Sequence, residues 1–364
     1  MAIYIHQLKN WANFQWRDQA FISLLSEVRN LQGKLMGKVE LLGFELKDEA
    51  NLETLVQDVV QSSEIEGEIL NPEQVRSSIA TKLGLENSGL ENSDRHIDGV
   101  VEMMLDATQN SDKSLYRERL FGWHAALFPT GRSGMHKIEV AKWRTGDMQV
   151  VSGGMGREIV HYEAPKAALL AQEMEQFIHW FNTESDLDPI LKAAIAHLWF
   201  VTIHPFDDGN GRMARAIADM QLSKADGVNQ RFYSMSAQIK NERKSYYNIL
   251  GQTQQGDLDI TAWIIWFLAC LKKAILSSNT IIDKVVQKHR FWMKNAALIS
   301  NERQRKMLNK LMDDFKGNLS TSKWAKMTKS SQDTALRDIT DLIKKGILIK
   351  AKSGGRSTHY KLKR

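Results

Sequence analysis

The chain has 364 residues, of which 43% are apolar and 25% are charged, so it is long and apolar enough for two or three folded domains and not for long disordered segments. Its single cysteine excludes a disulfide framework and a cysteine-based metal site. The charge is uneven: residues 301–364 contain 17 Lys and Arg against 6 Asp and Glu, a net charge of +11, whereas the whole chain carries +6. The basic excess therefore belongs to the C-terminal part, where nucleic-acid binding and a solvated basic face are both open.

No targeting or membrane segment is expected. The N-terminal sequence MAIYIHQLKNW lacks the charged and apolar regions of a secretory signal. The longest apolar run, ITAWIIWFLACL, has 12 residues and is too short to cross a bilayer. We therefore expect a cytoplasmic protein without a membrane partner.

Apolar residues recur at helical spacing along most of the chain. This spacing predicts helices over residues 21–39, 51–68, 166–181, 190–203 and 258–275. Asn71 and Pro72 form an N-cap followed by proline at the first helical position, so a further helix is expected to begin there. The polar stretch 86–96 is rich in Gly, Asn and Ser and predicts a surface loop.

One segment between the helices has the pattern of strands. Two short β-prone runs, 148–151 and 158–162, flank a glycine-rich turn, which predicts a β-hairpin. The first run consists of Met148, Gln149, Val150 and Val151.

The pattern changes again near residue 300. Three short helical segments are followed by two β-prone segments around the sequence KSGGRS. Ser331 is expected to cap the third helix and Gly346 to end it. Three helices and a basic β-ribbon are the parts of a winged helix-turn-helix domain, so a DNA contact through residues 300–364 is a further expectation.

The stretch HPFDDGNGR joins two predicted helices with chemistry that a plain loop does not need. Gly209, Asn210 and Gly211 allow positive φ angles that direct successive backbone N–H groups into one concavity. Arg212 and Arg215 follow on one face of the next helix. Together with the N-terminus of that helix, these groups form a site for a polyphosphate.

An acid and a histidine complete this stretch. The carboxylate of Asp208 would repel a phosphate unless a divalent cation lies between them, and Mg²⁺ typically uses one or two carboxylates plus phosphate oxygens. His204, at the edge of the site, is placed to take a proton from an incoming hydroxyl. A capping loop with a surface histidine is the alternative, and it explains the glycines but not the charged residues. A P-loop is excluded because no Gly-Lys-Ser/Thr follows the glycines.

The sequence HPFDDGNGRMAR resembles, without a gap, the signature of the Fic family, H-P-F-x-[D/E]-G-N-G-R-x-x-R. Members of this family transfer a nucleotide monophosphate, usually AMP from ATP, to a protein hydroxyl. The resemblance implies that His204 is the general base and that Asp208 holds Mg²⁺ on the phosphates. The residues implied to contact the phosphates are Asn210, Gly211, Arg212 and, at the γ-phosphate, Arg215.

The resemblance also gives the hairpin and a later segment a role. In the family, such a hairpin pairs with the backbone of the target by strand addition, so residues 148–151 become the expected docking edge. The alternative is a purely structural hairpin. The segment SAQIKNERKSYYNIL resembles the one whose tyrosines border the nucleotide, which makes Tyr246 and Tyr247 candidates for the adenine site. Their alternative role is that of core aromatics.

The predicted helix 51–68 offers an independent test of the site. Its apolar face continues through Ser63 to Glu66, so the carboxylate of Glu66 points to the core and needs a cationic partner, whereas Glu64 and Glu68 point elsewhere. The alternative is an acid at a helix end that faces solvent.

The sequence SSEIEG resembles the inhibitory motif [S/T]-x-x-x-E-[G/N] of self-inhibited Fic proteins through Ser62, Glu66 and Gly67. The resemblance implies that Glu66 pairs with Arg215, so that ATP loses its γ-phosphate contact and binds unproductively. In some members, the same glutamate also supports the removal of AMP.

The resemblance implies a mainly α-helical protein of three domains: an N-terminal helical domain with the inhibitory helix (1–100), a Fic core with a β-hairpin flap (101–285), and a winged-helix domain (286–364). The expected function is a self-inhibited protein adenylyltransferase that modifies Tyr, Ser or Thr hydroxyls of target proteins, itself included, and releases pyrophosphate. Its expected partners are ATP with Mg²⁺, the target proteins and a second copy of the chain. The alternatives are a de-AMPylase, a transferase with another nucleotide donor, and a DNA-binding regulator that uses the core as a nucleotide sensor.

Overall fold

The structure is a computed structural model that describes residues 4–85, 93–152, 159–313, 315, 317–351 and 358–363. It divides the chain into two compact units, Met1–Ile281 and Ile282–Arg364, which are described separately below. The division into three domains stays a prediction.

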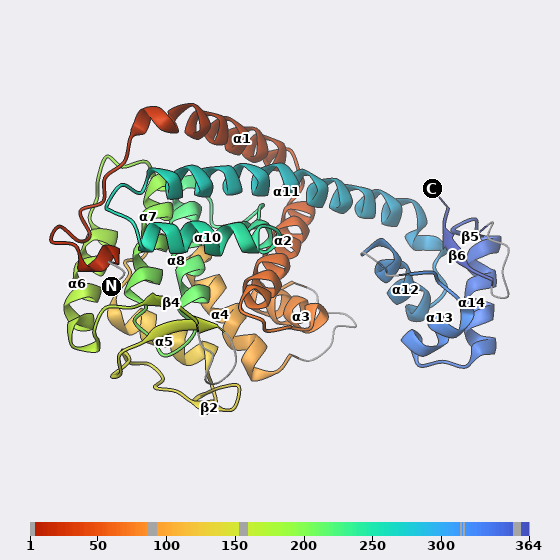
Figure 1. Ribbon diagram of the computed structural model, residues 1–364. Helices are drawn as coiled ribbons and strands as arrows, with labels where there is room; N and C mark the ends of the chain where they lie inside the picture. Colours follow the sequence, from red (N-terminus) through yellow and green to blue (C-terminus); the bar gives the residue numbers. More distant parts are fainter. Residues whose placement is uncertain are drawn as a thin grey trace. The chain divides into compact units, whose positions relative to one another are not determined.

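The first unit is mainly helical, as the sequence predicts (Figure 1). Its helices are α1 (Ile22–Glu40), α2 (Phe44–Ile65), α3 (Pro72–Lys82), α4 (Arg95–Gln109), α5 (Arg117–Leu127), α6 (Leu170–Asn182), α7 (Pro189–Ile203), α8 (Asn210–Asp226), α9 (Met235–Asn241), α10 (Arg243–Gln254) and α11 (Thr261–Asn295), of which the last continues past the boundary of the unit. Short 3₁₀ turns precede α1 and α6.

The helix α7 is the centre of this unit. The side chain of Asp188 accepts a hydrogen bond from the backbone N–H of Ile190, and Pro189 occupies the first turn, so the sequence itself sets the start of the helix. Every residue from Ile190 to Ile203 is buried, as expected of a helix that is apolar on all sides. The helix packs against α8, which lies beside it in Figure 1. The stretch HPFDDGNGR forms the loop between these two helices (204–209) and the first turn of α8, so it is fixed at both ends by the core.

Two short hairpins interrupt the helices. The strands β1 (Arg132–Ser133) and β2 (His136–Lys137) form the first, and β3 (Gln149–Ser152) and β4 (Ile159–Glu163) form the second, which the sequence predicted. The pairing of β3 and β4 is antiparallel, and its register shifts between Val150 and Val151. Glu158, the first residue of the predicted second run, lies outside the described residues.

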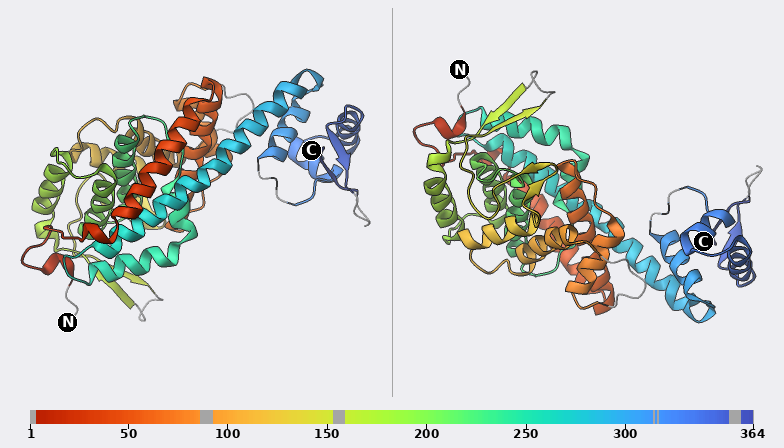
Figure 2. Two further views of the ribbon diagram at one scale, coloured as in Figure 1. Left: turned by 90° about the horizontal axis from the view of Figure 1, so that it is seen from above. Right: turned by 90° about the horizontal axis from the view of Figure 1, so that it is seen from below.

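The N-terminal segment packs on the second hairpin. Tyr4, Tyr162 and Ala164 form a small buried cluster against which the side chains of Met148 and Val150 lie. Both views of Figure 2 show the N-terminal segment beside these strands. One face of the hairpin is therefore covered by residues that precede α1.

The helix α2 ends earlier than predicted. Its last residue is Ile65, Glu66 is the C-cap, and Gly67 has a φ of 87°. The backbone N–H of Glu68 donates to the carbonyl of Ser63, and that of Gly67 donates to the carbonyl of Glu64, which is the Schellman arrangement that reverses the chain at a helix end. The prediction of a helix to residue 68 is therefore wrong by one turn, and the reversal matters for the site.

One described segment, Thr261–Leu298, is long and apolar enough to cross a membrane by length and composition. The expectation from the sequence rests only on the uninterrupted apolar run of 12 residues, which ends where Lys272 and Lys273 follow. In the structure Trp263, Phe267 and Leu271 of α11 are fully buried in the first unit. A core helix meets the same criterion, so the expected lack of a membrane partner stays a prediction.

Within the described residues, the second unit contains the end of α11, three further α-helices and a two-stranded sheet. The further helices and the strands are α12 (Glu302–Met312), α13 (Thr321–Thr328), α14 (Gln332–Lys344), β5 (Leu348–Lys350) and β6 (Tyr360–Leu362). Ser331 caps α14 by accepting from the backbone N–H of Thr334, and Gly346 follows the helix with a φ of 72°, as predicted.

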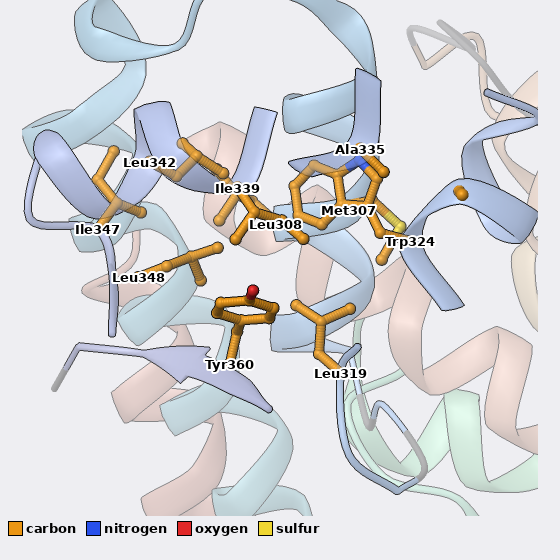
Figure 3. Packing of buried hydrophobic residues seen from close by; sticks show 11 residues of the cluster. Met307, Leu308, Leu319, Trp324, Ala335, Ile339, Leu342, Ile347, Leu348 and Tyr360 are labelled. Atoms are coloured by element: carbon orange, nitrogen blue, oxygen red, sulfur yellow. The ribbon is translucent and has the colours of Figure 1, made fainter. Parts of the chain in front are cut away.

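The core of this unit joins all three helices to the sheet. Figure 3 shows Trp324 and Met307 packed beside Leu308, with Leu348 and Tyr360 of the two strands facing them. An isolated bridge pairs Leu319 with Tyr360 and extends the sheet. This order of elements is the one that a winged helix requires, and the assignment to that class stays a prediction.

Candidate active site

The loop after α7 has a fixed backbone. His204 adopts the left-handed conformation with a φ of 52° and a ψ of 58°, which non-glycine residues rarely do. Gly209 has a φ of 81°, and a Cβ atom there would lie 2.9 Å from the ring of Phe128, so only glycine fits. Phe206 is fully buried and stacks on His124 with a centroid distance of 4.2 Å. The loop is therefore a rigid part of the core.

Asn210 closes this loop. Its side-chain amide donates to the carbonyl of Phe206 at 2.7 Å, and its side-chain oxygen accepts from the backbone N–H of Phe206 at 3.0 Å. The side chain is only 2% exposed. In this structure it shapes the turn into α8, and its predicted phosphate contact stays a prediction.

The imidazole of His204 is oriented for proton transfer. Its Nδ1 lies 3.1 Å from the carbonyl oxygen of Val201, and because a carbonyl only accepts, Nδ1 must carry the proton. Burial lowers the pKa of His204, so the ring is neutral at neutral pH. In that form Nε2 has a free electron pair and can accept a proton from a hydroxyl.

Asp208 is held beside the start of α8. Its Oδ1 accepts from the backbone N–H of Gly209 at 2.5 Å, and its Oδ2 accepts from the hydroxyl of Ser133 in β1. A partly exposed carboxylate next to a helix N-terminus fits a Mg²⁺ ion that arrives with phosphate oxygens and water. Within the described part of the chain, no group of three or more His, Cys, Asp or Glu side chains is placed to hold a metal ion.

Arg215 is paired with the end of α2. Its Nη1 donates to Oε1 of Glu66 at 2.8 Å, its Nε donates to the hydroxyl of Ser62 at 2.9 Å, and its Nη2 donates to the carbonyl of Ser62 at 2.8 Å. A Cβ atom on Gly211 would lie 2.1 Å from Oε1 of Glu66, so the carboxylate rests directly on this glycine. The structure thus brings together the residues of the two motifs that are about 140 positions apart in the sequence.

The second arginine is also paired, with a glutamate that we expected to point away. Arg212 is 4% exposed, and its Nη1 donates to Oε2 of Glu68 at 2.7 Å. The other oxygen of Glu68 is bonded to Nε2 of His96 on α4. The expectation for Glu68 is wrong because Gly67 reverses the chain after α2, and the sequence signal for this reversal was the glycine itself.

The two tyrosines of α10 have different surroundings. Tyr246 is 1% exposed, and its hydroxyl lies 2.9 Å from Nε2 of the buried His197. Tyr247 is 41% exposed, and the guanidinium of Arg243 lies 5.3 Å from the centre of its ring. The burial of Tyr246 agrees with a core aromatic, whereas Tyr247 presents a ring that a ligand can reach.

In the predicted docking edge, residues 148–151, partly buried and exposed residues alternate. Gln149 and Val151 are exposed, while Met148 and Val150 are partly buried against the N-terminal segment. The strand β3 pairs with β4 on one side, and among the described strands no other pairs with it. Its free edge is thus available for strand addition.

Comparison with known proteins gives two family matches. Residues 114–222 match the Fic/DOC family, and residues 4–85 match a domain of unknown function, DUF4172. The chain is 28% identical over 237 residues to a protein adenylyltransferase Fic of Drosophila virilis and 27% identical to that of Drosophila melanogaster. These matches cover 62% of this chain but 43% and 42% of the relatives, so the chain spans less than half of their length.

Two solved structures have the same fold. A Fic family protein from Desulfovibrio desulfuricans G20 has a TM-score of 0.52 with 19% identity and covers 94% of this chain and 96% of its own. A Fic-domain signalling protein from Bacteroides thetaiotaomicron VPI-5482 has a TM-score of 0.54 with 21% identity and covers 72% of this chain and 97% of its own. They support the mainly helical architecture.

Proposed function

The chain belongs to the Fic/DOC family through the Fic domain at residues 114–222, and from this premise we propose that it is a self-inhibited protein adenylyltransferase. The observation that carries the proposal is the ion pair between Glu66 and Arg215, which lies in the same loop-and-helix site as the oriented His204. The relatives that share the domain are named protein adenylyltransferases.

The proposed reaction follows from the positions of these groups. Nε2 of His204 takes the proton of a target hydroxyl, and the resulting oxygen attacks the α-phosphorus of ATP. A new bond forms between this oxygen and phosphorus, the bond from the α-phosphorus to the α–β bridging oxygen breaks, and pyrophosphate leaves. The start of α8 and the guanidiniums of Arg212 and Arg215 bind the phosphates. Mg²⁺, held by Asp208, would neutralise charge on the phosphates.

The proposed inhibition acts on both arginines at once. The carboxylate of Glu66 pairs with Arg215, and that of Glu68 pairs with Arg212. A triphosphate needs the same guanidiniums in the same place and meets two negative charges instead. ATP binding in a productive position therefore requires the turn after α2 to move away from α8.

The experiment that tests the proposal is labelling with ATP radioactive at the α-phosphate. We expect Glu66→Gly to raise labelling of the chain itself by roughly tenfold or more, the factor that corresponds to about 1.4 kcal/mol of pairing energy. Adding His204→Ala should abolish the label. Glu64→Gly is the matched control, since Glu64 lies in the same helix end but pairs with Lys240.

Two outcomes would contradict the proposal. Equal labelling of Glu66→Gly and the wild type would remove the inhibitory role of Glu66. Full labelling of Glu66→Gly/His204→Ala would show that His204 is not the base. If the wild type removes AMP from a labelled chain and Glu66→Gly does not, the de-AMPylase alternative gains support.

A second candidate function concerns the second unit alone. We propose that this unit binds DNA, because basic side chains are exposed on α13, α14 and the sheet. These residues are Lys326, Lys329, Arg337, Lys344, Lys350 and Lys361. A gel shift of the full chain should show affinity that falls by roughly tenfold or more between about 50 and about 200 mM salt. Arg337→Glu with Lys344→Glu should weaken it, Lys34→Glu in α1 should not, and equal shifts for all three proteins would refute DNA binding.

A further inference from the structure

One buried arginine links the catalytic loop to the hairpin β3–β4. Arg144 is 2% exposed, and its guanidinium donates in three directions. Its Nε donates to the carbonyl of His204 at 2.9 Å, its Nη1 to the carbonyl of Gly146 at 2.7 Å, and its Nη2 to the carbonyl of Pro165 at 2.5 Å. Its own backbone N–H donates to the carbonyl of Pro205 at 2.9 Å.

The positions of these acceptors explain what the side chain does. Gly146 precedes β3, and Pro165 follows β4, so the two carbonyls mark the two legs at the open end of the hairpin. The third carbonyl belongs to the histidine whose ring carries the proposed base. A planar guanidinium with donors in a fixed fork can hold three such groups at set angles. The hairpin and His204 are thereby held at one mutual distance.

The backbone of His204 needs such support. Its left-handed conformation is unfavourable for a residue with a Cβ atom, and surrounding contacts must maintain it. Its N–H donates to the carbonyl of Phe200, as in a helix cap, and its carbonyl is the group that Arg144 binds. The direction of this peptide and therefore the position of the ring depend on both contacts.

A second tether runs parallel to the first. The hydroxyl of Tyr162, in β4, donates to the carbonyl of Thr202 at 2.7 Å, two residues before His204. Tyr162 is itself 3% exposed and packs edge-on against Tyr4 with a centroid distance of 5.2 Å. The hairpin is thus attached to the end of α7 from one side and to the loop after it from the other.

We infer that Arg144 is the positioning residue that fixes where the β3 edge holds a target hydroxyl relative to Nε2 of His204. This inference rests on the proposed function. A target backbone added to β3 must present its hydroxyl within hydrogen-bond distance of the base, and a displacement of about 1 Å costs roughly 100-fold in rate. The phosphate contacts lie on α8 instead, so Arg144 governs the transfer step and leaves the affinity for ATP unchanged.

The test uses the full chain in the Glu66→Gly background. Arg144→Lys keeps the positive charge but replaces the three-armed fork by a single ammonium group. We expect the rate of self-labelling at saturating ATP to fall roughly 10- to 100-fold, with the Kd for ATP within about threefold of the parent. Arg117→Lys is the matched control, since Arg117 lies on the surface of α5 beside Glu118, and it should leave both quantities unchanged.

Hydrogen exchange of the same proteins gives a readout that does not depend on activity. Arg144→Lys should speed exchange in the peptides 146–152, 159–165 and 204–209, and leave α2 as in the parent. Unchanged exchange in these peptides refutes the anchoring role. A loss of labelling that equals the loss of ATP affinity, or no loss at all, refutes the positioning role. If Glu66→Gly itself does not label, the proposed function fails, and the exchange result alone decides whether Arg144 anchors the hairpin.

Discussion

Arg144 and Arg215 lie in the same site and are each 2% exposed, yet only Arg215 has a carboxylate among its hydrogen-bond partners. Each guanidinium arm of Arg144 donates to a backbone carbonyl of the segment 114–222 that matches the Fic/DOC family. Arg215 meets the carboxylate of Glu66 and two oxygens of Ser62, all at the end of α2. Carbonyls of a fixed backbone cannot leave without local unfolding, whereas a carboxylate can be replaced by another anion.

This difference suggests how a fixed catalytic geometry and the proposed inhibition can be combined in one site. The side chain of Glu66 is 30% exposed, so a turn of α2 can return it to water at small cost. In the proposed mechanism, the phosphates of a nucleotide then take its place, because phosphate oxygens accept hydrogen bonds from a guanidinium as a carboxylate does. The carbonyls around Arg144 have no comparable substitute, so we expect the contacts of Arg144 to stay in place when the turn after α2 moves.

The largest expected effect is on stability: replacing Arg144 should lower the free energy of unfolding more than replacing Arg215. Arg144→Met removes three hydrogen bonds from a charged donor, one of them to the carbonyl of the buried Pro165, and we expect a loss of about 3–5 kcal/mol in the free energy of unfolding of the first unit. Arg215→Met should cost less, about 2–3 kcal/mol, because the two oxygens of the buried Ser62 lose a donor whereas Glu66 can turn to solvent. Urea denaturation followed by circular dichroism measures both. Equal losses would contradict the division into fixed and exchangeable partners.

The next largest effect is the dependence of stability on pH, which two buried carboxyl groups near Arg215 should cause. Asp219 follows Arg215 by one turn of α8, Asp58 precedes Ser62 by one turn of α2, and both carboxylates share the buried Arg231. Burial and the neighbouring Asp58 raise the pKa of Asp219 to about 8. Arg144 has no carboxylate among its described hydrogen-bond acceptors, so the response that Asp219 gives to pH should arise beside Arg215.

The sign of this response follows from proton binding. Between the ordinary pKa of 3.8 and about 8, the folded state keeps the proton of Asp219 and the unfolded state releases it. The free energy of unfolding should therefore fall as the pH rises through this range, by up to about 1.4 kcal/mol per pH unit. Asp219→Asn cannot release a proton, and its unfolding free energy measured from pH 5 to pH 8 should show less of this decrease. A parallel decrease in both proteins would refute the assignment.

The sequence predicts the residues around Glu66 and Arg215 better than it predicts the contacts of Arg144. The histidine, glycines and arginines of the loop are close together in the sequence, so a short motif identifies them. Glu66 is predicted because it is an acid on an otherwise apolar helix face. Arg144 shows no such pattern. Its acceptors are backbone carbonyls, which every residue has, and the farthest is 60 positions away. No residue type in the sequence marks a partner of Arg144, so its role can be seen only in the folded structure.

Glu68 illustrates a failure of another kind. Its residue type was visible, but the assumption of a continuous helix placed it on the wrong face. A reversal of the chain at a single left-handed glycine moved it from the expected outer face to Arg212. A helix boundary that is wrong by three residues therefore changes the electrostatics of the site, although it leaves the fold prediction intact.

The smallest expected effect tests whether Glu68 contributes, together with Glu66, to the proposed inhibition. The side chain of Glu68 is 32% exposed and also bonded to His96, so its pairing with Arg212 is worth roughly 0.5–1 kcal/mol. Glu68→Ala should then raise self-labelling by about two- to fivefold, less than Glu66→Gly does, and the double variant should exceed either one. Initial rates of label incorporation measure this. If Glu68→Ala lowers labelling in the Glu66→Gly background, Glu68 orients Arg212 for the phosphates, and the inhibition is due to Glu66 alone.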